Sequence, residues 1–125
     1  ASRAAGMELV EVTLGRAVIS LTVGPSHVNG LAVCHGGYLF MLADTAMAFA
    51  SNSANRVALA AAAQIDFLRA ARLGDTLVAT ATMRTDGKRT GITDVEVRRQ
   101  DPSGDELIAL MRGRTTKTGG LVKSQ

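Results

Sequence analysis

A run of apolar residues from Tyr38 to Ala50 constrains the fold of this chain more than any other feature. Asp44 and Thr45 are its only clearly polar side chains, and the run contains no glycine or proline. This composition favours a helix, which we place from about Gly37 to Ala50. Because apolar side chains lie nearly all round it, we expect other elements to bury this helix on most faces. A carboxylate in such a helix is costly unless it is paired, hydrogen-bonded or functional, so Asp44 is the candidate centre of function.

The rest of the chain carries the alternating patterns of β-strands. A hairpin is expected over residues 7–24, and four further strands over residues 56–68, 76–84, 92–99 and 106–116. These elements predict an α+β fold in which an antiparallel sheet wraps one long central helix. We expect residues 1–125 to form a single domain, with residues 118–125 as a flexible tail.

The composition argues against several classes of protein. No apolar run reaches the ~20 residues that a membrane-spanning helix needs. The net charge is +3, but the basic residues are scattered and only 3% of the residues are aromatic, which does not favour nucleic-acid binding. The charge fits a small phosphorylated ligand equally well. The single cysteine, Cys34, leaves no internal disulfide, and with no signal peptide visible we expect a cytoplasmic protein.

Gly36 and Gly37 lie at the start of the predicted helix. The first N–H groups of a helix have no partner inside it, and they carry part of its positive dipole. Glycine also lets another group approach the backbone closely. The pair therefore suits a carbonyl oxygen that becomes negative in a transition state. The alternative is a tight entry turn packed against the sheet.

The spacing between Gly36 and Asp44 restricts how the two can act together. Eight positions separate them, which corresponds to roughly 12 Å along a helix. If they form one active site, they come from two chains, as in a two-fold dimer with facing helices. The alternative for Asp44 is a structural carboxylate that accepts hydrogen bonds from its neighbours.

The two histidines and the cysteine leave other chemistries open. A His–Asp general-base pair and a metal site that includes Cys34 are conceivable. Cys34 and His35 are adjacent rather than spaced as metal ligands, so we expect no metal ion and no cofactor. His35 fits a role in fixing the loop or the substrate, whereas His27 is expected at a solvated loop position and Cys34 as a small buried residue.

A second motif, Arg89-Thr90-Gly91, follows the predicted turn at Asp86-Gly87. It offers a cation, a hydroxyl group and an open stretch of backbone, which together suit a phosphate or pyrophosphate. The alternative is the solvated end of a hairpin.

Taken together, the motifs resemble those of the hotdog-fold acyl-CoA thioesterases, most closely the phenylacetic-acid-degradation thioesterase (PaaI) family. The resemblance covers nearly the whole chain, from about Ala1 to Lys117. It rests on Asn29-Gly30, Cys34-His35-Gly36-Gly37, Leu42-Ala43-Asp44-Thr45-Ala46, Asn52-Ser53, Ile65-Asp66-Phe67-Leu68-Arg69, Arg89-Thr90-Gly91, Asp94-Val95-Glu96-Val97 and Arg112-Gly113-Arg114.

The resemblance implies a hotdog fold and a dimer that commonly pairs into a tetramer. It implies that Asp44 is the catalytic carboxylate, as general base or nucleophile, and that the Gly36 N–H polarises the thioester carbonyl. The implied substrates are phenylacetyl-CoA and its ring-hydroxylated relatives. The remaining implied site residues are Asn29, His35, Gly37 and Thr45 near the thioester, and Arg89, Thr90 and Gly91 on the coenzyme A surface.

One segment departs from the family pattern. Related thioesterases often carry a hydroxyl residue on the strand after the helix, whereas Val57 to Ala63 offer only apolar side chains, with Ala60 near the expected place. These small residues would widen the acyl pocket. Two other functions remain open: a hotdog dehydratase or hydratase of hydroxyacyl or enoyl thioesters, and a non-catalytic acyl-CoA binding protein.

Overall fold

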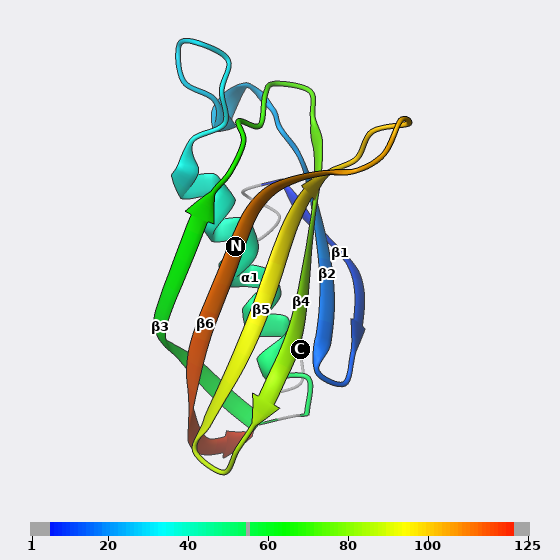
Figure 1. Cartoon of the computed structure of the whole chain (residues 1–125). Helices are drawn as coiled ribbons and strands as arrows, with labels where there is room; N and C mark the ends of the chain where they lie inside the picture. Colours follow the sequence, from blue (N-terminus) through cyan, green and yellow to red (C-terminus); the bar gives the residue numbers. More distant parts are fainter. Residues whose placement is uncertain (1–5, 55, 122–125) are drawn as a thin grey trace.

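The elements follow the order predicted from the sequence: a hairpin, one helix and four more strands. The computed structural model describes residues 6–54 and 56–121. Within them the predicted antiparallel sheet and central helix are confirmed, and the helix extends the prediction by one residue at each end (Figure 1). The elements are β1 (Met7–Thr13), β2 (Arg16–Thr22), the short 3₁₀ helix η1 (Pro25–His27), α1 (Gly36–Ser51), β3 (Arg56–Phe67), β4 (Thr76–Asp86), β5 (Thr90–Arg99) and β6 (Glu106–Leu121).

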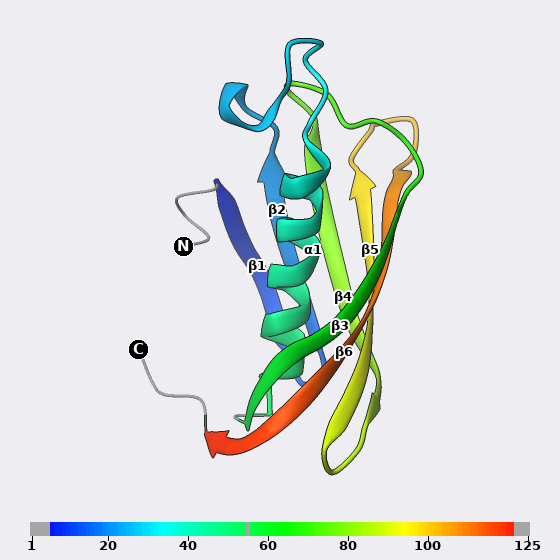
Figure 2. The same cartoon turned by 90° about the vertical axis from the view of Figure 1, so that its left-hand side faces the viewer.

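In the sheet, β3 does not lie beside β2 or β4, its neighbours in the chain order, but beside β6. The strand order is β1-β2-β4-β5-β6-β3, and all neighbours are antiparallel. After α1 the chain therefore crosses to the outer edge beside β6, so that β1 and β3 form the two edges of the sheet. Figure 2 shows α1 on one face of the curved sheet, between these two edges.

Only one face of α1 is buried in this chain. Its apolar stripe packs on the inner face of the sheet and comprises Leu39, Leu42, Ala43, Ala46, Met47 and Ala50. The opposite stripe is open, with Phe40, Met41 and Phe49 each 38–43% exposed. The expectation that the helix is buried on most faces is therefore wrong for the single chain, because the sheet curves along the helix without closing around it.

The last strand is longer than predicted. β6 continues to Leu121, so the predicted flexible tail is wrong for residues 118–121, whereas residues 122–125 lie outside the described part of the chain. The reason is the length of β3, whose first half pairs with this stretch: Ala58 lies opposite Lys117, and the Thr118 hydroxyl donates to the Val57 carbonyl at 3.5 Å. Residues with little strand preference of their own, two of them glycines, are thus kept in a strand by pairing with β3.

Gly113 on β6 allows α1 to lie close to the sheet. A Cβ at this position would lie 2.1 Å from the sulfur of Met47, whose side chain is 1% exposed. We expect Gly113→Ala to destabilise the fold by about 1–3 kcal/mol, because an overpacked core must shift side chains or backbone. Urea denaturation measures this change in the free energy of unfolding.

A control for this prediction is Gly30→Ala, where nothing lies within 4 Å of the added Cβ. This control is expected to leave the midpoint of unfolding within a few tenths of a kcal/mol of the parent. Equal midpoints for the parent and the Gly113 variant would show that the contact with Met47 is easily relieved.

Candidate active site

The start of α1 presents two free backbone donors. Its first residues are Gly36 and Gly37, and neither N–H has a hydrogen-bond partner among the described residues. His35 precedes them with φ −61° and ψ 137°, and its side chain does not cap the helix. Both glycines are exposed. The donors thus point away from the helix at the positive end of its dipole, where a developing oxyanion is stabilised.

Asn29 holds the loop that leads into this helix. Its Oδ1 accepts hydrogen bonds from the backbone N–H groups of Leu31 and Val33, at 2.9 and 3.2 Å. Its own N–H donates to the Val33 carbonyl at 2.9 Å. The predicted site residue Asn29 therefore lies in the loop before the helix, with its side-chain oxygen already engaged.

His27 is part of the same scaffold and is not solvated. Its side chain is buried, so the expected solvated position is wrong; its Nδ1 accepts the Gly24 N–H at 2.8 Å, and its ring meets that of Tyr38 edge-on at 4.8 Å. The His27 carbonyl accepts the His35 N–H at 2.8 Å. The His35 ring is exposed near Tyr38, and Cys34 is buried as expected.

Asp44 lies in the middle of the open face of α1. It is half-buried, with Phe40 and Met41 one turn before it and Ala48 and Phe49 one turn after it. Burial raises the pKa of its carboxyl above the ordinary value, and no hydrogen bond or ion pair with a described residue contributes to that shift. Asp44 therefore shows no hydrogen bond or ion pair with the described residues of this chain that would give it a structural role.

Thr45 stands beside this carboxylate on the same open face. Its hydroxyl donates to the Met41 carbonyl at 2.7 Å, which fixes the proton along the helix. The hydroxyl oxygen can therefore only accept a further hydrogen bond, for example from a water molecule.

Within one chain the two predicted catalytic groups do not meet. Gly36 is the first residue of α1 and Asp44 the ninth of its sixteen. The helical rise puts roughly 12 Å between them. The cavity that adjoins Gly36 has no carboxylate among its lining residues.

The Arg89-Thr90-Gly91 motif lies at the opposite end of the molecule from Gly36. It forms the end of the β4–β5 hairpin, on the side where α1 ends (Figures 1 and 2). Arg89 and Thr90 are exposed, but Gly91 is buried, and a Cβ there would lie 3.1 Å from the Thr85 carbonyl oxygen. A ligand at this hairpin would therefore reach the first two residues and not the third.

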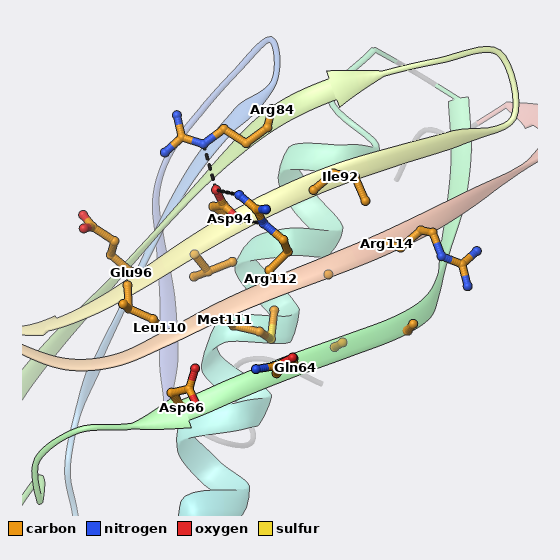
Figure 3. A pocket seen from close by; sticks show the side chains of 14 residues that line it. Gln64, Asp66, Arg84, Ile92, Asp94, Glu96, Leu110, Met111, Arg112 and Arg114 are labelled. Atoms are coloured by element: carbon orange, nitrogen blue, oxygen red, sulfur yellow. Dashed lines mark hydrogen bonds and ion pairs between the residues drawn. The ribbon is translucent and has the colours of Figure 1, made fainter.

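A hollow of about 730 Å³ lies on the outer face of the sheet, away from α1. Figure 3 shows Arg84 and Arg112 directed at Asp94, with hydrogen bonds of 2.9 Å and 2.6 Å. The hydrogen bond from Arg112 lowers the pKa of Asp94 to about 2, and Arg84 adds to the effect. The sheet separates this ion-pair cluster from Asp44, so we do not assign it to the candidate active site.

A smaller cavity of about 360 Å³ adjoins Gly36, with Phe67 in its wall. Phe67 belongs to the motif Ile65-Asp66-Phe67-Leu68-Arg69, and its sequence context predicted no role for it. No local pattern could have paired it with Gly36, because the contact joins the end of β3 to the start of α1.

Two negative observations concern only the described residues. No group of three or more histidine, cysteine, aspartate or glutamate side chains lies close enough to hold a metal ion. No helix there has the length and hydropathy needed to cross a membrane.

The chain is similar in sequence and structure to known thioesterases. The model of the Thioesterase superfamily matches residues 31–105. Acyl-coenzyme A thioesterase PaaI from Escherichia coli is 43% identical over 99% of this chain and 86% of its own length, and the structure of that protein superposes with a TM-score of 0.92 over 98% of this chain. A Streptococcus mutans protein solved with bound acetyl CoA is 27% identical, with a TM-score of 0.86 over 93% of this chain and 91% of its own.

Proposed function

Because the chain belongs to the thioesterase superfamily and is a thioester hydrolase with a hotdog fold, we propose that it hydrolyses acyl-CoA thioesters to the free acid and coenzyme A. The observation that carries this proposal is the half-buried carboxylate of Asp44 on an open helix face, whose pKa no described residue shifts through a hydrogen bond or ion pair. The E. coli relative is named an acyl-CoA thioesterase, and the S. mutans neighbour was solved with acetyl CoA.

The proposed chemistry needs one base and one oxyanion donor. Asp44 takes a proton from a water molecule, whose oxygen adds to the thioester carbonyl carbon. The Gly36 N–H donates to the carbonyl oxygen while it becomes negative, with Gly37 beside it. When the carbonyl re-forms, the C–S bond breaks and the sulfur of coenzyme A leaves as a thiolate, which takes up the proton. The raised pKa of Asp44 makes its carboxylate a better base than an exposed aspartate.

Two chains are required to assemble these groups. β3 is an edge strand with exposed apolar residues, Leu59 and Phe67 among them, and the open face of α1 lies next to it. A free edge beside an apolar face is suited to pairing with a second copy. We propose a two-fold dimer in which the start of one α1 faces the middle of the other. Two such dimers are proposed to pair into a tetramer.

The other predicted site residues take supporting roles in this proposal. Thr45 accepts a hydrogen bond from the attacking water, since its proton is held by Met41. Asn29 and His35 set the path of the loop before Gly36, and the exposed His35 ring is available to the substrate. Arg89 and Thr90 offer a cation and a hydroxyl to the phosphates of coenzyme A. In an antiparallel pair of helices, this hairpin of one chain approaches the Gly36 end of the other.

We propose aryl-acyl thioesters, such as phenylacetyl-CoA and hydroxyphenylacetyl-CoA, as the preferred substrates. The related E. coli protein PaaI comes from the phenylacetic acid degradation operon. The exposed alanines of β3 leave room beside the open helix face for a bulky acyl group.

A thiol-release assay tests the function directly. The protein is incubated with phenylacetyl-CoA, hydroxyphenylacetyl-CoA, hexanoyl-CoA and acetyl-CoA, and free coenzyme A is measured with a thiol reagent. We expect release with kcat/KM within about 10⁴–10⁸ M⁻¹s⁻¹ for the best substrate, and aryl substrates at the head of the series. Absence of thiol release from all four would contradict the proposal, and hydration of an enoyl-CoA in a parallel assay would support a hydratase instead.

A further inference from the structure

The cavity beside Gly36 is apolar. Its inner wall is formed by buried side chains of Cys34, Leu39 and Ala71, and its outer wall by Phe67 and Leu68. Its one charged lining residue, Arg69, donates to the Leu107 carbonyl at 2.9 Å and pairs with Glu106 at 3.7 Å. That guanidinium is thus held by the β6 strand. At about 360 Å³ the cavity lies at the small end of ligand sites, and its lining selects an uncharged, apolar group.

Phe67 directs its ring at the first residue of α1. A Cβ built on Gly36 would lie 3.3 Å from Cζ of this ring, with Cε1 and Cε2 at 3.5 and 3.7 Å. The ring therefore lies over the glycine that carries the proposed oxyanion donor. Phe67 remains 52% exposed, so packing inside the chain does not account for a large apolar side chain at this position.

The placement of the aromatic residues gives a second, independent observation. The chain has four, and none of them belongs to the buried core, which is built from aliphatic residues, methionine and cysteine. Three lie on α1, namely Tyr38, Phe40 and Phe49. Phe67 is the only one supplied by the sheet, and it ends β3 at the cavity. Tyr38 packs against the core, whereas the three phenylalanine side chains are exposed, two on α1 and one at the end of β3.

We propose that Phe67 determines the acyl specificity of the enzyme. Its ring forms the wall of the apolar cavity and packs against the aryl ring of the acyl group while the carbonyl is held at Gly36. Offset or edge-to-face contact between two aromatic rings favours an aryl group over an alkyl chain of similar size. This inference rests on the proposed thioesterase function, and it adds a residue and a subsite to it.

The test compares two substrates that share the coenzyme A part and differ only in the acyl group. kcat/KM is measured for phenylacetyl-CoA and for hexanoyl-CoA with the parent protein, Phe67→Ala and Phe67→Leu. We expect the ratio of aryl to alkyl kcat/KM to fall about five- to tenfold in both variants, because the ring contact is lost. Leu110→Ala removes an apolar side chain of similar exposure from the outer face of the neighbouring strand and should leave the ratio unchanged.

The possible results distinguish failure of the proposed role of Phe67 from failure of the proposed thioesterase function. A parent protein that releases no thiol contradicts the proposed function itself. If the parent is active but both variants lower kcat/KM equally for the two substrates, the cavity takes the pantetheine arm, and the inference is wrong. Unchanged kinetics in both variants, or loss of the dimer by sedimentation in both, also overturns it, since Phe67 would then be a bystander or an interface residue.

Discussion

Replacement of Asp44 by asparagine is expected to lower kcat for thioester hydrolysis by about 10²–10⁴-fold, because the water loses its general base. Asparagine has nearly the same shape, so the bound substrate should keep its place and KM should change little. In the parent, kcat/KM should rise with pH through the pKa of Asp44, which lies above the ordinary value for aspartate. The residual kcat/KM of the Asp44→Asn variant should not show this rise with pH.

The stability of the same variant separates catalysis from folding. The pKa of Asp44 is raised in the fold, so the folded chain binds this proton more tightly than the unfolded chain. At pH values above the pKa that Asp44 has in the unfolded chain, the ionised carboxylate therefore lowers the free energy of unfolding. This loss of stability disappears when the pH falls below that pKa. Asp44→Asn should accordingly show a Tm equal to or above that of the parent at neutral pH.

A matched control is Asp105→Asn, an exposed aspartate in the β5–β6 turn, which should keep parental activity. An Asp44 variant with full turnover would remove Asp44 from the mechanism. A variant that is inactive and also less stable would indicate a structural role.

Replacement of Gly36 by proline is expected to lower kcat by about 10²–10³-fold, because it removes one oxyanion donor. Proline is tolerated at the first position of a helix, where its missing N–H has no helical partner in any case. The backbone of His35, at φ −61° and ψ 137°, already has the conformation that a residue before proline adopts. The fold should therefore survive the change, as circular dichroism and thermal melting can verify.

Gly36→Ala is the matched control for this variant. It adds the same Cβ, 3.3 Å from the ring of Phe67, but it retains the N–H. Activity lost only in the proline variant would assign the effect to the missing donor. Equal loss in both variants would assign it to the contact with Phe67, contrary to the proposed mechanism.

The two variants together test whether the site is shared between chains. When Asp44→Asn and Gly36→Pro chains are unfolded and refolded as an equal mixture, about half of the dimers are mixed. Each mixed dimer has one site with both groups intact if Gly36 and Asp44 come from different chains, so about a quarter of the parental activity should return. No recovery, with mixed dimers demonstrated by a tag on one chain, would place both groups in the same chain.

Local sequence patterns predicted most of the secondary structure. The apolar run from Tyr38 predicted α1 because helix propensity and the absence of breakers act within a few residues. Alternation predicted the strands, and glycines marked their turns, as at Gly15 and Gly87. The end of β6 was missed because Lys117, Thr118 and the two glycines after them give no local strand signal, and only pairing with β3 extends the strand.

The candidate site was predictable in part. The isolation of Asp44 among apolar residues marked it, and helical rise alone separated it from Gly36. The burial of His27 and of Gly91 was not predicted, because each depends on neighbours distant in sequence or on the far side of a hairpin. Gly36 and Phe67 are separated in the sequence by the whole of α1 and β3, so no local periodicity predicts that they lie close together.

The sequence by itself determined which segments are helix or strand and which carboxylate stands out, because those properties depend on residues a few positions apart. The tertiary structure alone decided that β3 lies at the edge of the sheet, that one face of α1 stays open around Asp44, and that the ring of Phe67 lies beside Gly36. These features depend on the order of the strands, which is set by long-range pairing and the burial of the core as a whole.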